Sequence, residues 1–167
     1  MRVVVVYYSR KGTTEGLAGM VAEGFRKRGH LVEMVPIRHS KRLGFIQTGR
    51  ASVTKRDMEL VNEDSDYDLT EADVVVIGGP IFASNVNPYT RTYIQRARGL
   101  EGKPGGVFIC CYSKAKMGRG LVDRLAEMAE EKGLRVMGRL VGSTSLREEY
   151  PRMADEFAGQ VLEGLDH

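Results

Sequence analysis

The start of the chain constrains the fold more than any other stretch. Four consecutive valines, residues 3–6, are extended by Tyr7 and Tyr8 and then give way to a polar segment at residues 9–14. A short apolar run bounded by turn residues is typical of a strand that is buried on both faces, as in a parallel sheet. Beyond this segment the apolar residues recur at helical spacing, at Leu17, Met20, Val21 and Phe25. The stretch therefore predicts a strand, a tight loop and a helix.

The loop at residues 9–14 has the composition of a phosphate site. It contains three hydroxyl residues and one glycine, and it precedes a helix whose first N–H groups have no partners within the helix. The second glycine of a Walker A loop is absent, and so are the three glycines of a dinucleotide-binding turn. We therefore expect a site for one phosphate group. The alternative is an ordinary strand–helix turn in which a threonine caps the helix.

The remainder of the chain repeats the alternation of strand and helix. Further strands are expected at 30–37, 72–79, 105–111 and 134–142, and helices at 13–28, after Pro88, around 121–129 and from about 148. This order predicts an α/β fold with a doubly wound, five-stranded parallel sheet covered by helices on both faces. A long irregular connection, residues 38–69, separates the second strand from the third. Ligands of such sheets bind at the carboxyl ends of the strands, where the loops at 9–14, 80–87 and 111–118 should converge.

Composition narrows the class of protein. The chain has 167 residues, which suits a single domain over 1–167, and a net charge of only +3, which does not favour nucleic acid as a partner. No apolar run approaches the length of a membrane span, and the first strand begins too early for a signal peptide. Two adjacent cysteines, Cys110 and Cys111, provide neither a disulfide framework nor the spacing of a metal site. We expect a cytoplasmic protein without a membrane partner, either a monomer or a homodimer.

Three stretches of the chain resemble the flavodoxin-like family. Residues 9–14 are similar to its phosphate loop, Ser/Thr-x-Ser/Thr-Gly-x-Ser/Thr, although Lys11 stands where a hydroxyl is usual. Residues 73–82 are similar to its third strand and second flavin loop, and residues 103–113 to the strand before its third loop. The resemblance covers essentially the whole chain, and it implies strand order 2-1-3-4-5, an FMN cofactor and redox chemistry. The tryptophan and glycine that are common in the second loop of the family are absent here.

The resemblance also assigns the residues that would bind FMN, rather than FAD or NAD. Ser9, Gly12, Thr13 and Thr14 would donate to the phosphate, with the Thr14 hydroxyl contributing one hydrogen bond. The remaining residues expected at the cofactor are Arg10 and Lys11 as nearby charges, Pro80, Ile81 and Phe82 at the ring, Ala83, Ser84 and Asn85 at its edge, and Cys111, Tyr112, Ser113 and Gly118 in the third loop. Phe82 and Tyr112 are the two expected stacking partners.

Other residues are expected to be structural. We interpret Cys110 and Cys111 as small apolar residues at the end of a buried strand. His30 and His39 are isolated and should be solvated, and Tyr67 lies among acids that suggest a surface segment.

The function is expected to be redox chemistry, with alternatives left open. A response-regulator receiver needs acids after the first strand and an aspartate after the third, which Ser9 and Pro80 replace; a low-molecular-weight tyrosine phosphatase needs a C-x5-R motif that neither cysteine begins. We expect an FMN protein that exchanges electrons with a redox partner protein or a small acceptor. The alternatives are an NAD(P)H-dependent quinone or flavin reductase and a cofactor-free interaction domain. Flavodoxins that act as electron carriers are commonly acidic and bind basic partner surfaces. The isoelectric point of this chain, near 8.9, therefore counts against such basic partners.

Overall fold

The protein is a three-layer α/β structure in the computed structural model, which describes residues 1–40, 57–112 and 115–166. Five parallel strands form the sheet in the order β2-β1-β3-β5-β6, as the sequence predicts, and a short strand β4 pairs antiparallel with the end of β3. The strands are β1 (Arg2–Tyr7), β2 (Leu31–Pro36), β3 (Val74–Phe82), β4 (Asn85–Val86), β5 (Pro104–Cys111) and β6 (Arg135–Ser143). Counting only the five main strands, this is the predicted order 2-1-3-4-5.

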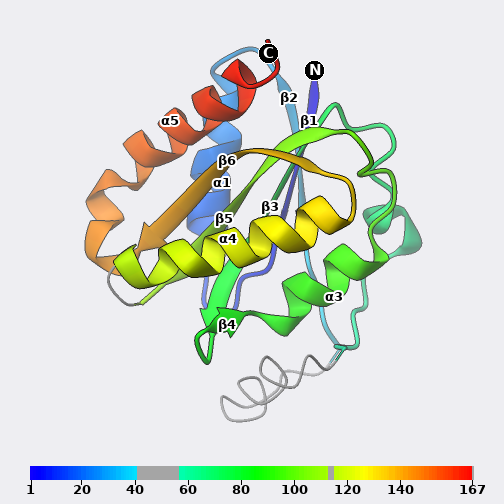
Figure 1. The fold of residues 1–167 in the computed structure, drawn as a ribbon, viewed down its shortest axis with the longest axis horizontal. Helices are drawn as coiled ribbons and strands as arrows, with labels where there is room; N and C mark the ends of the chain where they lie inside the picture. Colours follow the sequence, from blue (N-terminus) through cyan, green and yellow to red (C-terminus); the bar gives the residue numbers. More distant parts are fainter. Residues whose placement is uncertain (41–56, 113–114, 167) are drawn as a thin grey trace.

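Helices cover both faces of the sheet (Figure 1), with α1 and α5 on one face and α3 and α4 on the other. Their bounds are α1 (Thr13–Arg26), α3 (Pro88–Arg96), α4 (Ala115–Glu131) and α5 (Tyr150–Glu163), and two short 3-10 helices are η1 (Asp64–Tyr67) and η2 (Thr144–Glu149). Pro88 occupies the first turn of α3, where its missing N–H is not needed. Among the described residues, no helix is both long enough and apolar enough to cross a membrane.

The valine run at the start of the chain is the centre of both layers of the core. Val3 and Val5 pack with α1 and α5, whereas Val4 and Val6 pack with α3 and α4, because successive side chains of a strand point to opposite faces. All four are at most 4% exposed. A central parallel strand can be apolar at every position because it is covered on both sides.

Part of the long connection, residues 41–56, lies outside the described residues. The part that follows is packed against the body of the protein. Met58, Leu60, Tyr67 and Leu69 are all buried in the core layer beneath α3. Tyr67 stacks on Tyr93 of α3 with ring centroids 5.2 Å apart, so the expectation that Tyr67 lies on the surface is wrong.

Candidate functional site at the carboxyl edge of the sheet

A cleft opens where the loops after β1, β3 and β5 meet, as expected for the switch point of a doubly wound sheet. Its volume is about 200 Å³. The residues that line it are Arg10, Lys11, Thr13 and Thr14 from the first loop, Pro80, Ile81 and Phe82 from β3, and Tyr112 after β5. Eight of the residues predicted to bind a cofactor are therefore brought together in one cleft.

The first loop is folded around the Ser9 hydroxyl. This oxygen accepts hydrogen bonds from the backbone N–H of Gly12 at 3.1 Å and of Glu15 at 3.2 Å. Gly12 precedes α1 with φ of 91°, a left-handed conformation that glycine adopts without steric cost. The Ser9 side chain therefore satisfies an N–H group in the first turn of α1, as a helix cap does, although Ser9 precedes the helix. The two hydrogen bonds to Ser9 do not involve the side chains of Thr13 and Thr14.

The first turn of α1 faces the cleft. A helix has no internal acceptor for its first N–H groups, and the helix dipole places partial positive charge at the same end. The Glu15 N–H is bonded to Ser9 and the Gly16 N–H to the Gly12 carbonyl, which leaves the N–H groups of Thr13 and Thr14 at the cleft end of the helix. This arrangement suits an anion.

The two threonines differ in what their side chains do. Thr13 is partly exposed and lines the cleft. Thr14 is only 3% exposed, and its side chain lies close enough to the Cys110 thiol on β5 to lower the pKa of that thiol. The predicted hydrogen bond from the Thr14 hydroxyl to a phosphate stays a prediction; Thr14 lines the cleft, and the burial of its side chain favours its backbone N–H as the donor there.

Cys110 belongs to a small polar group beneath the loop. Burial raises the pKa of Cys110 to about 11, and the nearby Thr14 side chain offsets only part of this effect. Burial likewise raises the pKa of Tyr150, the first residue of α5, to about 12. Both groups are therefore neutral near pH 7, and Cys110 is a packed thiol rather than a reactive thiolate, as the sequence indicated.

An aromatic cluster supports the other wall of the cleft. The Tyr8 ring stacks on Tyr89 with centroids 4.3 Å apart and meets Phe82 edge-on at 6.3 Å. The Tyr8 hydroxyl lies 3.3 Å from Nε2 of His39, whose ring is 4.7 Å from that of Tyr89. His39 was expected to be solvated; it is instead part of this cluster. Phe82 is therefore the partly exposed end of an aromatic cluster.

Phe82 carries a cation on its ring. The guanidinium carbon of Arg10 lies over the ring at 5.6 Å from its centroid. A flat ligand that stacks on the same face of Phe82 must therefore displace Arg10, which can turn toward an anion held at the first turn of α1. With N–H donors at one end and an aromatic wall at the other, the residues present fit a ligand that joins an anionic group to a flat ring, as a flavin nucleotide does.

The second loop is a tight hairpin. Phe82 pairs with Asn85, and the two residues between them, Ala83 and Ser84, have φ of 47° and 56°. Positive φ at both central positions marks a type I′ turn, which usually contains asparagine and glycine. Left-handed conformations cost a residue with a Cβ roughly 1–2 kcal/mol. The hairpin is therefore strained at the edge of the cleft, where Ala83 and Ser84 are exposed.

Two asparagines fix the hairpin to the helices. Asn87, only 1% exposed, donates from Nδ2 to the Pro80 carbonyl at 2.9 Å, while its Oδ1 accepts from the Thr90 N–H at the start of α3. The Arg124 guanidinium of α4 donates to Oδ1 of Asn85 at 3.1 Å. Neither Asn87 nor Arg124 was predicted to lie near the site; an asparagine directly before a proline-initiated helix is the sequence signal that identifies the cap.

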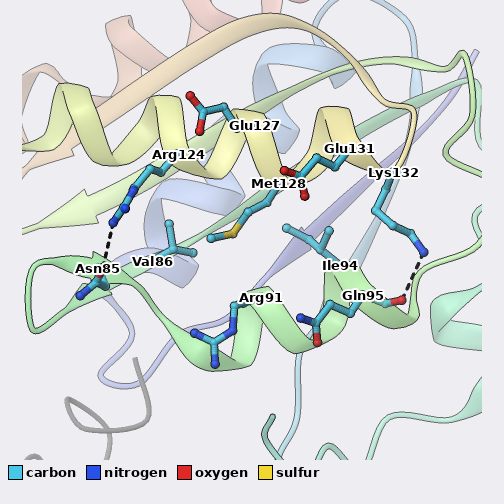
Figure 2. A pocket seen from close by; sticks show the side chains of 10 residues that line it. All are labelled: Asn85, Val86, Arg91, Ile94, Gln95, Arg124, Glu127, Met128, Glu131 and Lys132. Atoms are coloured by element: carbon cyan, nitrogen blue, oxygen red, sulfur yellow. Dashed lines mark hydrogen bonds between the residues drawn. The ribbon is translucent and has the colours of Figure 1, made fainter. Parts of the chain in front are cut away.

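Arg124 also borders a second groove, between α3 and α4 (Figure 2), with a volume of about 460 Å³. Its apolar residues are Val86, Ile94 and Met128. Arg124 reaches across one end to Asn85, and the Lys132 ammonium donates to the Gln95 carbonyl at the other end, 3.2 Å away. Asn85 thus lines this groove and is not among the residues that line the first cleft, and its predicted contact with a cofactor stays a prediction.

The predicted third-loop residues have separate positions. Tyr112 lines the cleft but is 66% exposed, so a ligand would cover it. Cys111 is buried at the end of β5. Gly118 lies within α4 on the side that faces the sheet, where an added Cβ would be 2.5 Å from Val141, and it does not line the cleft. Ser113 lies outside the described residues.

Comparisons with known proteins agree with this architecture. The chain is 33% identical over 118 residues to an NAD(P)H dehydrogenase (quinone) from Paracoccus denitrificans, a match that covers 64% of this chain and 52% of the relative. The chain thus spans about half the length of the curated relatives that it matches. No protein-family model matches the chain.

Solved structures are similar over nearly the whole chain. Flavodoxin 1 from Bacillus cereus is 19% identical with a TM-score of 0.68, and the match covers 98% of both chains. A flavodoxin from Streptococcus pneumonia TIGR4 is 18% identical with a TM-score of 0.70, covering 98% of this chain and 99% of the flavodoxin. The chain is therefore a protein of the flavodoxin-like fold.

Proposed function

We propose that this protein binds FMN in the cleft at the carboxyl edge of the sheet and acts as a flavin-dependent oxidoreductase. The observation that carries the proposal is the opening of the first turn of α1 onto a cleft walled by Phe82. An anion site beside a flat aromatic wall matches the two ends of FMN. The flavodoxin-like fold and the likeness to NAD(P)H dehydrogenases (quinone) support the same conclusion.

Each wall of the cleft would have a separate task. The N–H groups of Thr13 and Thr14 and the Thr13 hydroxyl would hold the phosphate, with Arg10 and Lys11 adding positive charge. Phe82 would support one face of the ring, and Tyr112 would cover the other. Bound FMN supplies one- or two-electron transfer, and the protein tunes it by the backbone and side chains at the ring edge, here the strained hairpin.

The test separates the phosphate end from the ring end. Thr13→Val keeps the shape of the side chain but removes a hydrogen bond to a charged phosphate, worth roughly 1.5–3 kcal/mol, so FMN affinity should fall about tenfold to a hundredfold. Riboflavin has no phosphate, and its affinity should hardly change. Both affinities are measured by fluorescence titration of the flavin.

Thr14→Val is the matched control, because the same substitution one residue on removes a hydroxyl on a side chain that is only 3% exposed and lies near Cys110. It should leave the FMN affinity within about threefold of the parent. Equal loss of FMN affinity in both variants, or equal loss of FMN and riboflavin in Thr13→Val, contradicts the assignment of the phosphate. Binding that prefers FAD to FMN contradicts the choice of cofactor, and absence of any flavin binding leaves a cofactor-free interaction domain.

A second candidate is favoured by the sequence likeness: an NAD(P)H-dependent quinone reductase. Because the chain spans only about half of the relative, the likeness does not transfer the whole activity. Anaerobic mixing of the FMN-loaded protein with NADPH or NADH distinguishes the two. Loss of the flavin absorbance at 450 nm within seconds, at about 100 μM nucleotide, indicates a reductase; no change over minutes indicates a carrier that is reduced by another protein.

A further inference from the structure

The mouth of the cleft carries exposed apolar side chains beside cations. Tyr112 is 66% exposed and Met117, in the first turn of α4, is 62% exposed. Lys116 and Arg119 flank Met117 and are exposed as well, and Lys11 lies across the cleft. Tyrosine, methionine and arginine are the residue types that protein interfaces favour. These five residues, Lys11, Tyr112, Lys116, Met117 and Arg119, are called the mouth surface below.

The side of α4 that bears these cations turns away from the sheet. Gly118 faces the sheet, since an added Cβ would meet Val141 and Ile109. Its neighbours Lys116, Met117 and Arg119 are exposed, so they project outward at the same edge as the cleft. The N-terminal turns of α1 and α4 therefore present their side chains to one surface.

These cations stand where they do not stabilise the fold. A cation near the positive end of a helix dipole is unfavourable by typically 0.3–1 kcal/mol, and no acidic residue in the first turn of α4 offsets it. Among the described residues, no salt bridge includes Lys11, Lys116 or Arg119. The nearest acids on the same elements are committed elsewhere: Glu15 accepts from the Tyr7 hydroxyl, and Asp123 pairs with Arg139. Helix dipoles and cations thus add to one positive field at the mouth.

We infer that the mouth surface docks an acidic protein, with Tyr112 and Met117 at the centre of the contact and Lys11, Lys116 and Arg119 around it. Charge complementarity selects an acidic partner, since the field accelerates the approach of anions and repels basic proteins. The exposed apolar centre distinguishes a protein from a small anion, which would leave Met117 in water. The purpose of the contact, electron exchange at the ring edge, rests on the proposed flavin function; the docking itself does not require the flavin.

The first experiment measures binding of a plant-type ferredoxin, a strongly acidic one-electron protein, by titration calorimetry at about 10 mM ionic strength, where charges interact over about 30 Å. The double substitution Lys116→Glu/Arg119→Glu should weaken binding at least about tenfold. The matched control is Lys27→Glu/Arg135→Glu, which reverses two exposed charges at the other edge of the sheet and gives the same net charge. It should weaken binding by less than about threefold.

Further titrations distinguish which kind of molecule binds to the mouth surface. Met117→Gln should weaken ferredoxin binding by about threefold to tenfold, because it removes an apolar contact and keeps the side-chain length. Basic cytochrome c should not bind. Each titration is made on the protein with FMN and on the protein without it, so that failure of flavin binding and failure of docking are separate results.

Three results overturn the inference. One is no ferredoxin binding by either form of the protein at about 10 mM ionic strength. Another is equal weakening by the two double substitutions, which would mean that net charge alone acts. The third is displacement of ferredoxin by a single-stranded DNA oligonucleotide at equal charge concentration, which would mean that the surface binds any polyanion.

Discussion

The two edges of the sheet differ in how they use left-handed backbone. In the loops that lead into strands, the described residues with positive φ are all glycines, namely Gly29, Gly99, Gly102 and Gly133. At the carboxyl edge, two such positions are occupied by Ala83 and Ser84. Left-handed geometry is free of steric cost for glycine but not for residues with a Cβ. The strain is therefore concentrated in the hairpin beside the cleft, where backbone strain is typical of functional sites.

The two edges of the sheet also differ in how their charged side chains are paired. At the amino edge, Arg2 pairs with Glu33 at 2.7 Å, and its backbone N–H donates to Asp73. Lys103 nearby donates to the carbonyls of Thr70 and Ala72. At the carboxyl edge the cations of the mouth surface take part in no salt bridge among the described residues. The charged groups named at the amino edge are bonded to other residues of the protein, whereas the cations of the mouth surface are available to a ligand or a partner.

The largest expected effect comes from substitution of Asn87, which anchors the hairpin at the carboxyl edge. Asn87→Ala removes the cap of α3 and leaves the buried Pro80 carbonyl without its donor. Loss of a cap costs about 1 kcal/mol and an unsatisfied buried group about 1–3 kcal/mol, so the free energy of unfolding should fall by roughly 2–4 kcal/mol. Urea denaturation measures the change. Asn85→Ala, which loses two exposed hydrogen bonds, one with Arg124 and one with the Ala83 carbonyl, should cost less than about 1 kcal/mol; equal costs would contradict the anchor role.

A second prediction concerns how the free energy of unfolding depends on pH through Cys110, which lies beneath the first loop. The pKa of Cys110 is raised from 9.0 to about 11 by burial, so the folded state keeps a proton that the unfolded state loses. The resulting stability is fully present below about pH 9 and is lost as the pH rises toward 11; two pKa units correspond to about 2–3 kcal/mol. Cys110→Ala should flatten the decline of the unfolding free energy between these values. Cys111→Ala is the control for lost volume and should retain the decline.

The sequence predicted the framework because the framework depends on local signals. Valine runs, turn residues and helical spacing fixed the five strands and their parallel order, and hydroxyls before a helix fixed the first loop. Interactions between distant segments were not predictable in this way. His39 and Tyr67 have polar neighbours in the sequence, and both are packed on aromatic rings of α3, Tyr89 and Tyr93. The proximity of Thr14 to Cys110 brings together two elements almost a hundred residues apart, and no local pattern in the sequence indicates it.

A third prediction removes the strain from the hairpin. Ala83→Asn/Ser84→Gly supplies the residues that a type I′ turn prefers, so the protein should become more stable by about 1–2 kcal/mol. Thermal unfolding measures this gain. Gly29→Ala, at a glycine of the opposite edge with φ of 82°, should lower stability by about 1–2 kcal/mol. If the double substitution also leaves FMN affinity and redox potential unchanged, the strain serves no purpose at the cleft.

The smallest expected effect comes from substitution of Arg2 at the amino edge. Arg2→Ala removes an ion pair in which both side chains are about half exposed, and exposed pairs contribute only about 0.2–1 kcal/mol. The loss should shrink further in about 1 M salt, where the Debye length is near 3 Å. Flavin binding should be unaffected. A loss above about 2 kcal/mol would show that the amino edge depends on this pair.

The stacked rings of Tyr8 and Tyr89 have an optical consequence. The chain contains no tryptophan, so its near-ultraviolet circular dichroism comes from seven tyrosines and five phenylalanines. Two phenol rings held 4.3 Å apart at 25° couple their electronic transitions, and this pair supports Phe82 at the wall of the cleft. In the protein without flavin, the ellipticity near 280 nm therefore contains a contribution from this wall, beside that of the stacked pair Tyr67 and Tyr93, without any added probe.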